Sequence, residues 1–180
     1  MKAYWCYEYP IGSISIAEKD GNIAYVLFTD NGVKVEQWFY CNGYTVDHVL
    51  LTDNAGKGLP PGFEQRETPL IKNAAKQMSE YFAGRRREFD LPLEFNGTDF
   101  QKRVWEALLT IPFGETCSYG EIAAQIGNPK AARAVGMANN RNPISIICPC
   151  HRVIGSDGSL IGYGGGLANK EYLLRLESRA

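Results

Sequence analysis

Residues 118–138, SYGEIAAQIGNPKAARAVGMA, decide the fold of the second half of the chain. Ser118 and Glu121 form a capping box that predicts a short helix, and Gly127 ends it. Asn128-Pro129 then starts a second helix, which is rich in small residues. A helix, a tight turn containing glycine and a second helix make the outline of a helix-turn-helix, a motif that often binds DNA. Two packed helices of another fold can share this outline, so by itself it leaves DNA binding open.

Another capping box, Thr98 with Gln101, starts the helix that precedes this motif. Phe100, Val104, Leu108 and Ile111 then recur at helical spacing until residues 112–114, Pro-Phe-Gly. Because the character of the sequence changes here, we expect two domains, residues 1–95 and residues 96–180. The second domain is predicted to be mostly helical.

The first domain begins with short β-rich runs separated by turn residues, which predicts an antiparallel meander. Thr68 and Pro69 start a helix that Gly84 ends. Its buried face is expected to hold Ile71, Ala74, Ala75, Met78, Tyr81 and Phe82. We expect strands at residues 3–9, 13–17, 23–28, 33–40 and 89–95, and a loop at residues 54–62. This combination predicts the α+β class.

The composition is that of an ordinary globular protein of 180 residues, 44% of them hydrophobic. The N-terminus lacks the apolar core of a signal peptide, and no run of 18 apolar residues occurs, so we expect a cytoplasmic protein without a membrane span. The five cysteines are then expected to be free thiols.

Charge is unevenly distributed along the chain. Residues 1–97 carry 10 lysines and arginines against 13 acids, and residues 98–180 carry 9 against 7, so the halves have net charges of −3 and +2. Between Glu121 and Asp157 there is no acidic residue. A basic face of this kind suits a phosphate backbone, although a solvated surface would look the same. The basic residues of that stretch are Lys130, Arg133, Arg141 and Arg152.

Residues 142–153, NPISIICPCHRV, carry the strongest candidate for chemistry. An apolar run ends in a proline, and a thiol, Cys150, follows beside an imidazole, His151. We expect a buried strand or extended segment to deliver Cys150 to a polar boundary. A neighbouring histidine or arginine lowers the pKa of a cysteine from about 8.5 toward neutrality, which makes the nucleophilic thiolate.

Three other interpretations of Cys150 compete with a reactive nucleophile. Buried cysteines are commonly inert. A zinc site is disfavoured because Cys148, Cys150 and His151 lie too close together to close a tetrahedron. A cysteine hydrolase draws its cysteine and histidine from separate elements. Cys6, Cys41 and His48 are too loosely spaced to predict a metal site, so no metal is assigned.

Several spaced motifs resemble one family, the methylated-DNA-protein-cysteine methyltransferases, also called O6-alkylguanine-DNA alkyltransferases. The resemblance is strong over residues 97–178 and general over the first domain. It implies a ribonuclease-H-like N-terminal domain and a C-terminal domain of winged helix-turn-helix type. The matching segments are residues 127–136 (GNPKAARAVG), 141–143 (RNP), 149–153 (PCHRV), 162–167 (GYGGGL) and Lys170 through Glu177.

The resemblance implies that Cys150 accepts the alkyl group of O6-alkylguanine in double-stranded DNA, and of O4-methylthymine too, in a single irreversible turnover. His151 takes the thiol proton through an ordered water, and Glu177 holds the imidazole. Tyr119 protonates N3 of the leaving base. Such a protein needs no cofactor, acts as a monomer and works at the nucleoid, or in the nucleus of a eukaryote.

The resemblance also assigns DNA contacts and a substrate pocket. Arg133 replaces the flipped nucleotide in the base stack, and the backbone at Cys150 and Val153 reads the guanine edge. Gly164 stands where many members have serine, and Ile161 where some have glycine, so we expect a narrower pocket with Ile161 in a packed wall. The remaining DNA contacts are Lys130, Ala131, Ala132 and Arg141, and the remaining pocket residues are Asn142, a hinge, and Tyr163.

A second function remains open within this family, that of a protein that binds the lesion without chemistry. Such relatives lack the nucleophile. Because Cys150, His151 and Glu177 stand at the matching positions, alkyl transfer is the favoured function.

Overall fold

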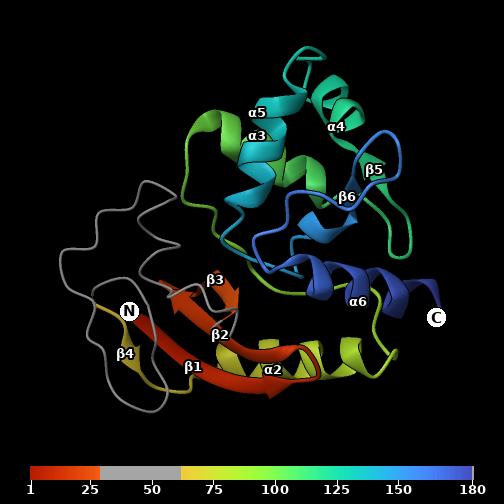
Figure 1. Cartoon of the computed structure of the whole chain (residues 1–180). Helices are drawn as coiled ribbons and strands as arrows, with labels where there is room; N and C mark the ends of the chain where they lie inside the picture. Colours follow the sequence, from red (N-terminus) through yellow and green to blue (C-terminus); the bar gives the residue numbers. More distant parts are fainter. Residues whose placement is uncertain (29–61, 180) are drawn as a thin grey trace. The chain divides into compact units, whose positions relative to one another are not determined.

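The computed structural model describes residues 1–28 and 62–179, which belong to two compact units, Met1–Glu94 and Phe95–Ala180 (Figure 1). The predicted strand at residues 33–40 and all but the last residue of the predicted loop lie outside the described residues. In the described ranges, none of the helices combines the length and the apolar character that a bilayer crossing requires.

The first unit is built on the predicted antiparallel meander, which the structure confirms. β1 (Lys2–Tyr9), β2 (Gly12–Lys19) and β3 (Asn22–Phe28) pair in sequence order, with Tyr4 opposite Ala17 and Ile16 opposite Val26. The turn between β2 and β3 needs positive φ at Asp20 and Gly21, 50° and 86°. A two-residue strand, β4 (Glu64–Gln65), extends the sheet in parallel beside β1 and is too short to be predicted.

Helix α2 (Pro69–Phe82) packs against this sheet and begins as predicted. The Thr68 hydroxyl accepts a hydrogen bond from the Ile71 amide at 3.2 Å, and Pro69 occupies the first turn. The predicted apolar face is buried, except that Phe82 is half-buried and stacks its ring 5.1 Å from that of Tyr9.

The predicted strand at residues 89–95 is wrong, because among the described residues only a single bridge forms there, between Ile23 and Leu93. Pro92 accepts a hydrogen bond from the Ile23 amide at 2.8 Å and the Glu94 amide donates to the Ile23 carbonyl at 3.0 Å, but Pro92 has no N–H with which to continue the pairing toward the preceding residues. The amide of Asp90 donates to Oε1 of Gln77, at 2.9 Å, instead of to a neighbouring strand. The ladder therefore cannot extend.

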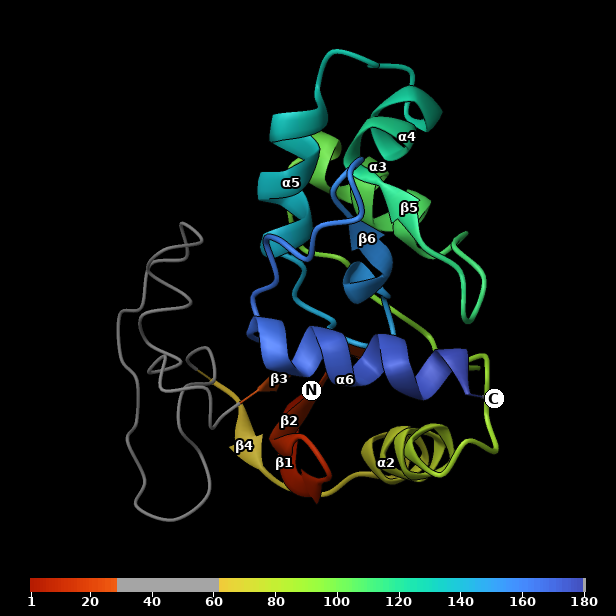
Figure 2. The same ribbon diagram turned by 45° about the vertical axis from the view of Figure 1, so that its right-hand side comes forward.

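The second unit is mostly helical, as predicted. Helices α3 (Asp99–Leu108), α4 (Tyr119–Gln125) and α5 (Ala132–Asn140) pack on one another, and α6 (Leu167–Ser178) lies beside the segment that follows them (Figure 2). Both predicted capping boxes are present. The fully buried Trp105 donates from its indole to the carbonyl of Ala138 at 2.8 Å, which ties α3 to α5.

Helix α5 begins later than predicted. Residues 128–131 form a turn, closed by the Ala131 amide on the Asn128 carbonyl at 2.9 Å, and Ala131 is the N-cap. Proline disfavours the helical conformation of the residue before it, so Asn128 stays outside the helix. The first helical hydrogen bond joins the Val135 amide to the Ala131 carbonyl at 2.8 Å.

The strand or extended segment expected before Cys150 is also wrong. Residues 143–149 form an irregular loop in which Ile146 has a φ of 72°, and a 3₁₀ helix, η1 (Cys150–Arg152), follows. The Asn142 side chain binds the amide of Ile144 at 3.0 Å and the carbonyl of Cys148 at 2.8 Å, so it takes the place of a strand partner. Beyond η1, β6 (Val153–Ile154) pairs in parallel with β5 (Cys117–Ser118).

Candidate active site

Cys150 is held at the start of η1, under the end of α5. Its side chain is buried, and Nδ2 of Asn142 donates to its Sγ at 3.0 Å. A second amide, Nδ2 of Asn139, donates to its carbonyl at 3.2 Å. Two buried amides, Asn139 near the end of α5 and Asn142 just beyond it, therefore fix the backbone and the sulfur of this residue.

His151, Glu177 and Arg152 form one buried cluster. Oε1 of Glu177 lies 2.8 Å from Nε2 of His151, and Arg152 grips the same carboxylate with Nε and Nη2 at 2.8 and 2.9 Å. The Gly114 amide adds a hydrogen bond to Oε2 at 3.1 Å. Burial would raise the pKa of Glu177, but the hydrogen bonds from His151 and Arg152 outweigh it and hold that pKa well below the ordinary value. The carboxylate is therefore ionised.

The expected low pKa of Cys150 is wrong for the protein without DNA. Burial raises the pKa of this thiol to about 11, although the Asn142 hydrogen bond and the charge of Lys170 act against it. Arg152, its neighbour in sequence, points to Glu177 instead, and burial lowers the pKa of His151, so the imidazole is neutral. The resting pair is consequently a thiol beside a neutral base.

The basic face is smaller than predicted. Arg152 is buried and donates through Nη1 to the Ile111 carbonyl at 2.6 Å, so it is not a surface charge. Lys130 and Arg133 are exposed, and Arg141, the C-cap of α5, is partly exposed. The exposed charges gather at the first turn of α5 and just before it.

A groove of about 720 Å³ runs beside α5 within the second unit. The hydroxyl of Tyr119 crosses to the far wall and donates to the Ile161 carbonyl at 2.8 Å. Gly162 leaves room for this hydroxyl, because a Cβ on it would lie only 3.0 Å away, whereas a Cβ on Gly136 would be in ordinary contact with the ring, 3.6 Å from its Cδ1. The groove is lined by Tyr119, Gly120, Ala132, Arg133, Gly136, Met137, Asn140, Gly155, Ser156, Asp157, Ser159, Ile161 and Gly162.

The predicted site residues thus fall into two groups. Cys150, His151, Glu177, Asn142 and Val153 are buried together with Tyr163, whose ring stands edge-on to that of His151 at 6.5 Å. In the groove lie Tyr119, Ala132, Arg133 and Ile161, whereas Lys130, Ala131, Arg141 and Gly164 do not line it.

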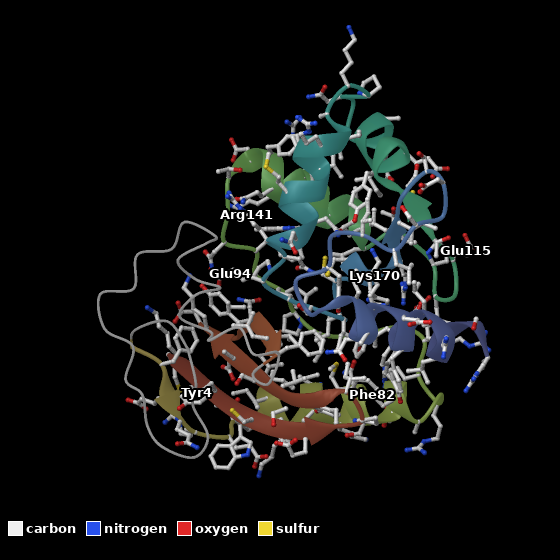
Figure 3. The ribbon with its side chains drawn as sticks, in the orientation of Figure 1. Tyr4, Phe82, Glu94, Glu115, Arg141 and Lys170 are labelled. Atoms are coloured by element: carbon white, nitrogen blue, oxygen red, sulfur yellow. The ribbon has the colours of Figure 1, made fainter. Side chains whose placement is uncertain are left out.

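Lys170 is a site residue that sequence analysis missed. It projects from α6 into the interior of its unit (Figure 3), with none of its side chain exposed. Its Nζ donates to the carbonyls of Val153, at 2.5 Å, and Ile161, at 2.8 Å. Burial lowers its pKa to about 8, while the Cys150 charge raises it. The only sequence signal was its place in a family motif.

The described residues contain no group of three or more histidine, cysteine, aspartate or glutamate side chains arranged to hold a metal ion. Cys6, Cys41 and His48 were considered above as metal ligands. The Cys6 sulfur lies 3.0 Å from the Ser15 hydroxyl, and Cys41 and His48 lie outside the described residues.

Ile161 lines the groove, but the expected packed wall is wrong, because half of this residue, 50%, is exposed. For the alkyl transfer that the resemblance implies, a side chain with this exposure is expected to impose a penalty of only about 1 kcal/mol on bulky alkyl groups, or roughly fivefold in rate. We expect Ile161→Gly to raise the benzyl-to-methyl ratio of single-turnover transfer by that factor. Ile161→Val is the matched control. An unchanged ratio in the glycine variant would show that Ile161 does not limit the size of the alkyl group.

Together, the fold and the site define a helix-turn-helix protein that keeps a buried cysteine, backed by a neutral histidine and an ionised glutamate, at the inner end of its second helix. Two family models match this chain. The model described as 6-O-methylguanine DNA methyltransferase, DNA binding domain, matches residues 99–179, and that described as its ribonuclease-like domain matches residues 2–95. The chain belongs to the 6-O-methylguanine DNA methyltransferase family.

Individual relatives agree with this assignment. A methylated-DNA–protein-cysteine methyltransferase of Methanosarcina acetivorans is 46% identical over 174 residues, which cover 97% of each chain. One of Mycobacterium bovis is 67% identical over 111 residues, 61% of this chain and 67% of its own. The crystal structure of the Mycobacterium tuberculosis O6-methylguanine methyltransferase matches with a TM-score of 0.78 and 42% identity, covering 99% of this chain and 94% of that one. A structure from the same organism in complex with DNA matches with a TM-score of 0.76 and 44% identity, over 98% and 93%.

Proposed function

We propose that this protein repairs DNA by moving the alkyl group of O6-alkylguanine, and of O4-methylthymine, irreversibly onto Cys150. The observation that carries the proposal is the buried Cys150 thiol, bonded to Asn142 and followed by a histidine whose partner is an ionised glutamate. The protein acts as a monomer on double-stranded DNA, in the cytoplasm at the nucleoid or in a eukaryotic nucleus.

Helix α5 and the residues that flank it supply the DNA contacts. Arg133, exposed in its first turn, fills the space of the extruded nucleotide, and Lys130, Ala131, Ala132 and Arg141 approach the backbone. The flipped base enters through the groove that Arg133 and Tyr119 line. Because Cys150 is only 3% exposed, side chains must move before the base reaches it, and we expect the hydrogen bond from the Tyr119 hydroxyl to the Ile161 carbonyl to break as the base enters.

His151 acts as the base that activates the Cys150 thiol. The ionised Glu177 accepts from Nε2, so this nitrogen carries the imidazole proton and Nδ1 is free to act as a base. Nδ1 takes the Cys150 proton through a water, and Glu177 stabilises the imidazolium that forms. Burial, which raises the pKa of the thiol, keeps the protein unreactive until this transfer occurs.

The sulfur attacks the alkyl carbon, so that a C–S bond forms as the bond from carbon to O6 breaks. The electron pair moves into guanine, and Tyr119 protonates N3. Burial raises the pKa of Tyr119, so its hydroxyl is still protonated when the base arrives. The carbonyls of Cys150 and Val153 read the guanine edge, beside Tyr163 and Gly164. The product is a thioether, a poor leaving group, so each molecule reacts once without any cofactor.

A lesion-binding protein without chemistry is the less favoured function. Such a protein does not need a thiol held by an amide, next to a base whose partner is ionised. The relatives named above carry a methyltransferase name.

The function is tested by incubating the protein with duplex DNA that contains O6-methylguanine and weighing the intact protein. We expect the mass to rise by one methylene, with one equivalent per protein, and peptide mapping to place it on Cys150. An adduct on Cys148, which is also buried, or more than one turnover per molecule would contradict the proposal.

Arg133→Ala is expected to slow repair of duplex DNA by about tenfold to a hundredfold and to leave reaction with free O6-methylguanine within about twofold, because the side chain stabilises the flipped state and not the transfer. Single-turnover rates on both substrates measure this. Lys130→Ala, an exposed neighbour, should change only duplex affinity and its salt dependence. Equal losses on duplex and base would exclude the stacking role of Arg133.

A further inference from the structure

Asn139 is a buried residue near the end of α5, with 1% of its surface exposed. One half of its amide is used, because Nδ2 donates to the Cys150 carbonyl at 3.2 Å. This contact also settles the orientation of the amide, since the opposite one would set two acceptor oxygens against each other. The other half, Oδ1, has no hydrogen-bond partner in the part of the chain that the structure describes.

Nδ1 of His151 is a second buried acceptor without a hydrogen-bond partner among the described residues. Its ring is fully buried, and this nitrogen finds no partner within residues 1–28 and 62–179 either. Because Nε2 donates to the ionised Glu177, Nδ1 has a lone pair and no hydrogen. A buried acceptor without a donor costs about 1–3 kcal/mol, so folded proteins rarely leave one unmatched.

Both acceptors are anchored to the same residue. Asn139 is bonded to the carbonyl of Cys150, and His151 is the next residue in the chain. Amide oxygen and nitrogen atoms lie roughly 2.3 Å apart, so Oδ1 is within about 5.5 Å of the Cys150 carbonyl oxygen. A single group that satisfies both acceptors must donate two hydrogens and still be small enough for a buried site, and water meets both conditions.

We propose that Asn139 is a positioning residue of the proton relay, whose Oδ1 and His151 Nδ1 together hold the water between the Cys150 thiol and the imidazole. This inference rests on the proposed function and adds a residue to it. The water donates one hydrogen to Oδ1 and the other to Nδ1, so its lone pairs are left to accept from the thiol.

Every proton and electron pair in this step is accounted for. The thiol hydrogen moves to the water oxygen while the hydrogen that the water donates moves to Nδ1, and the water is regenerated. The sulfur electron pair forms the bond to the alkyl carbon, and the pair of the broken bond stays on O6 of the base. Asn139 and Arg133 stand on the same helix, so the element that engages DNA also aligns the relay.

Asn139→Leu has nearly the same size and no polar atom. In the parent protein it is expected to lower the single-turnover rate constant on O6-methylguanine duplex by about tenfold, the value of one hydrogen bond to a reacting group. In a His151→Ala background, where the relay is already broken, the same substitution should lower the remaining rate by less than about twofold.

The comparison separates the relay from a purely structural role. Loss of the Nδ2 contact to the Cys150 backbone would lower the rate equally in both backgrounds, and that outcome would overturn the inference. Melting temperature and duplex affinity are measured for each variant. If Asn139→Leu does not fold, the same comparison in both backgrounds is made with Asn139→Met, whose side chain is more adaptable. Absence of any transfer by the parent protein would refute the proposed function, which keeps the two failures distinct.

Discussion

Replacing Glu177 by Gln is expected to cost about 3–5 kcal/mol of stability, because it leaves the buried Arg152 guanidinium without its counter-charge. The substitution keeps the shape of the side chain and removes only the charge that Arg152 and His151 share. An amide also offers one acceptor oxygen where the carboxylate accepts at two. Chemical denaturation at neutral pH measures this loss.

The pH dependence identifies the charge as the cause. The folded-state pKa of Glu177 is held well below its ordinary value of 4.5, so its stabilisation is complete above that value and is lost as the pH falls toward the folded-state pKa. The difference between parent and variant should therefore be constant near neutrality and shrink below the ordinary carboxyl pKa. A difference independent of pH would show that packing, not charge, is lost.

The same substitution should slow alkyl transfer by about 100-fold or more, because the imidazolium formed during the reaction loses its partner. Glu171→Gln is the matched control, since Glu171 lies on the same helix and makes an exposed ion pair with Arg175 at 2.6 Å. Exposed pairs of this kind contribute about 0–1 kcal/mol. Transfer by that control should be unchanged.

Elements specified by neighbouring residues could be predicted from the sequence. The capping boxes at Thr98 and Ser118 and the Thr68 cap each depend on contacts three residues apart, and all are present. The strand expected at residues 89–95 fails for a reason that no local pattern contains, because Gln77 of α2 takes the Asp90 amide. The irregular loop before Cys150 likewise depends on the hydrogen bonds of one side chain, Asn142.

For the site, residue identity was predictable but the direction of each side chain was not. Cys150 and His151 stand out through their chemistry, whereas adjacency in sequence wrongly placed the Arg152 charge beside the sulfur. The positive charge that does act on the sulfur comes from Lys170, twenty positions along the chain. Asn139 gave no sequence signal, because only the fold turns it toward Cys150.

Lys170→Met is expected to lower the alkyl-transfer rate near neutral pH by about tenfold to a hundredfold. Within the described ranges the buried ammonium has two carbonyls as partners and no carboxylate, so the charge that it can stabilise is the one that appears during the reaction. Methionine fills a similar volume and removes the charge.

Two measurements separate this charge from simple packing. The rate at which iodoacetamide modifies Cys150 near pH 7, where Lys170 is charged, should fall in the methionine variant and stay close to the parent value in Lys170→Arg, which keeps the charge. Because the pKa of Lys170 is about 8, the parent loses the same charge above that pH, so the rate ratio of parent to variant should be largest below pH 8 and decline above it. An unchanged iodoacetamide rate near pH 7, with transfer still impaired, would mean that Lys170 acts only by holding the carbonyls of Val153 and Ile161.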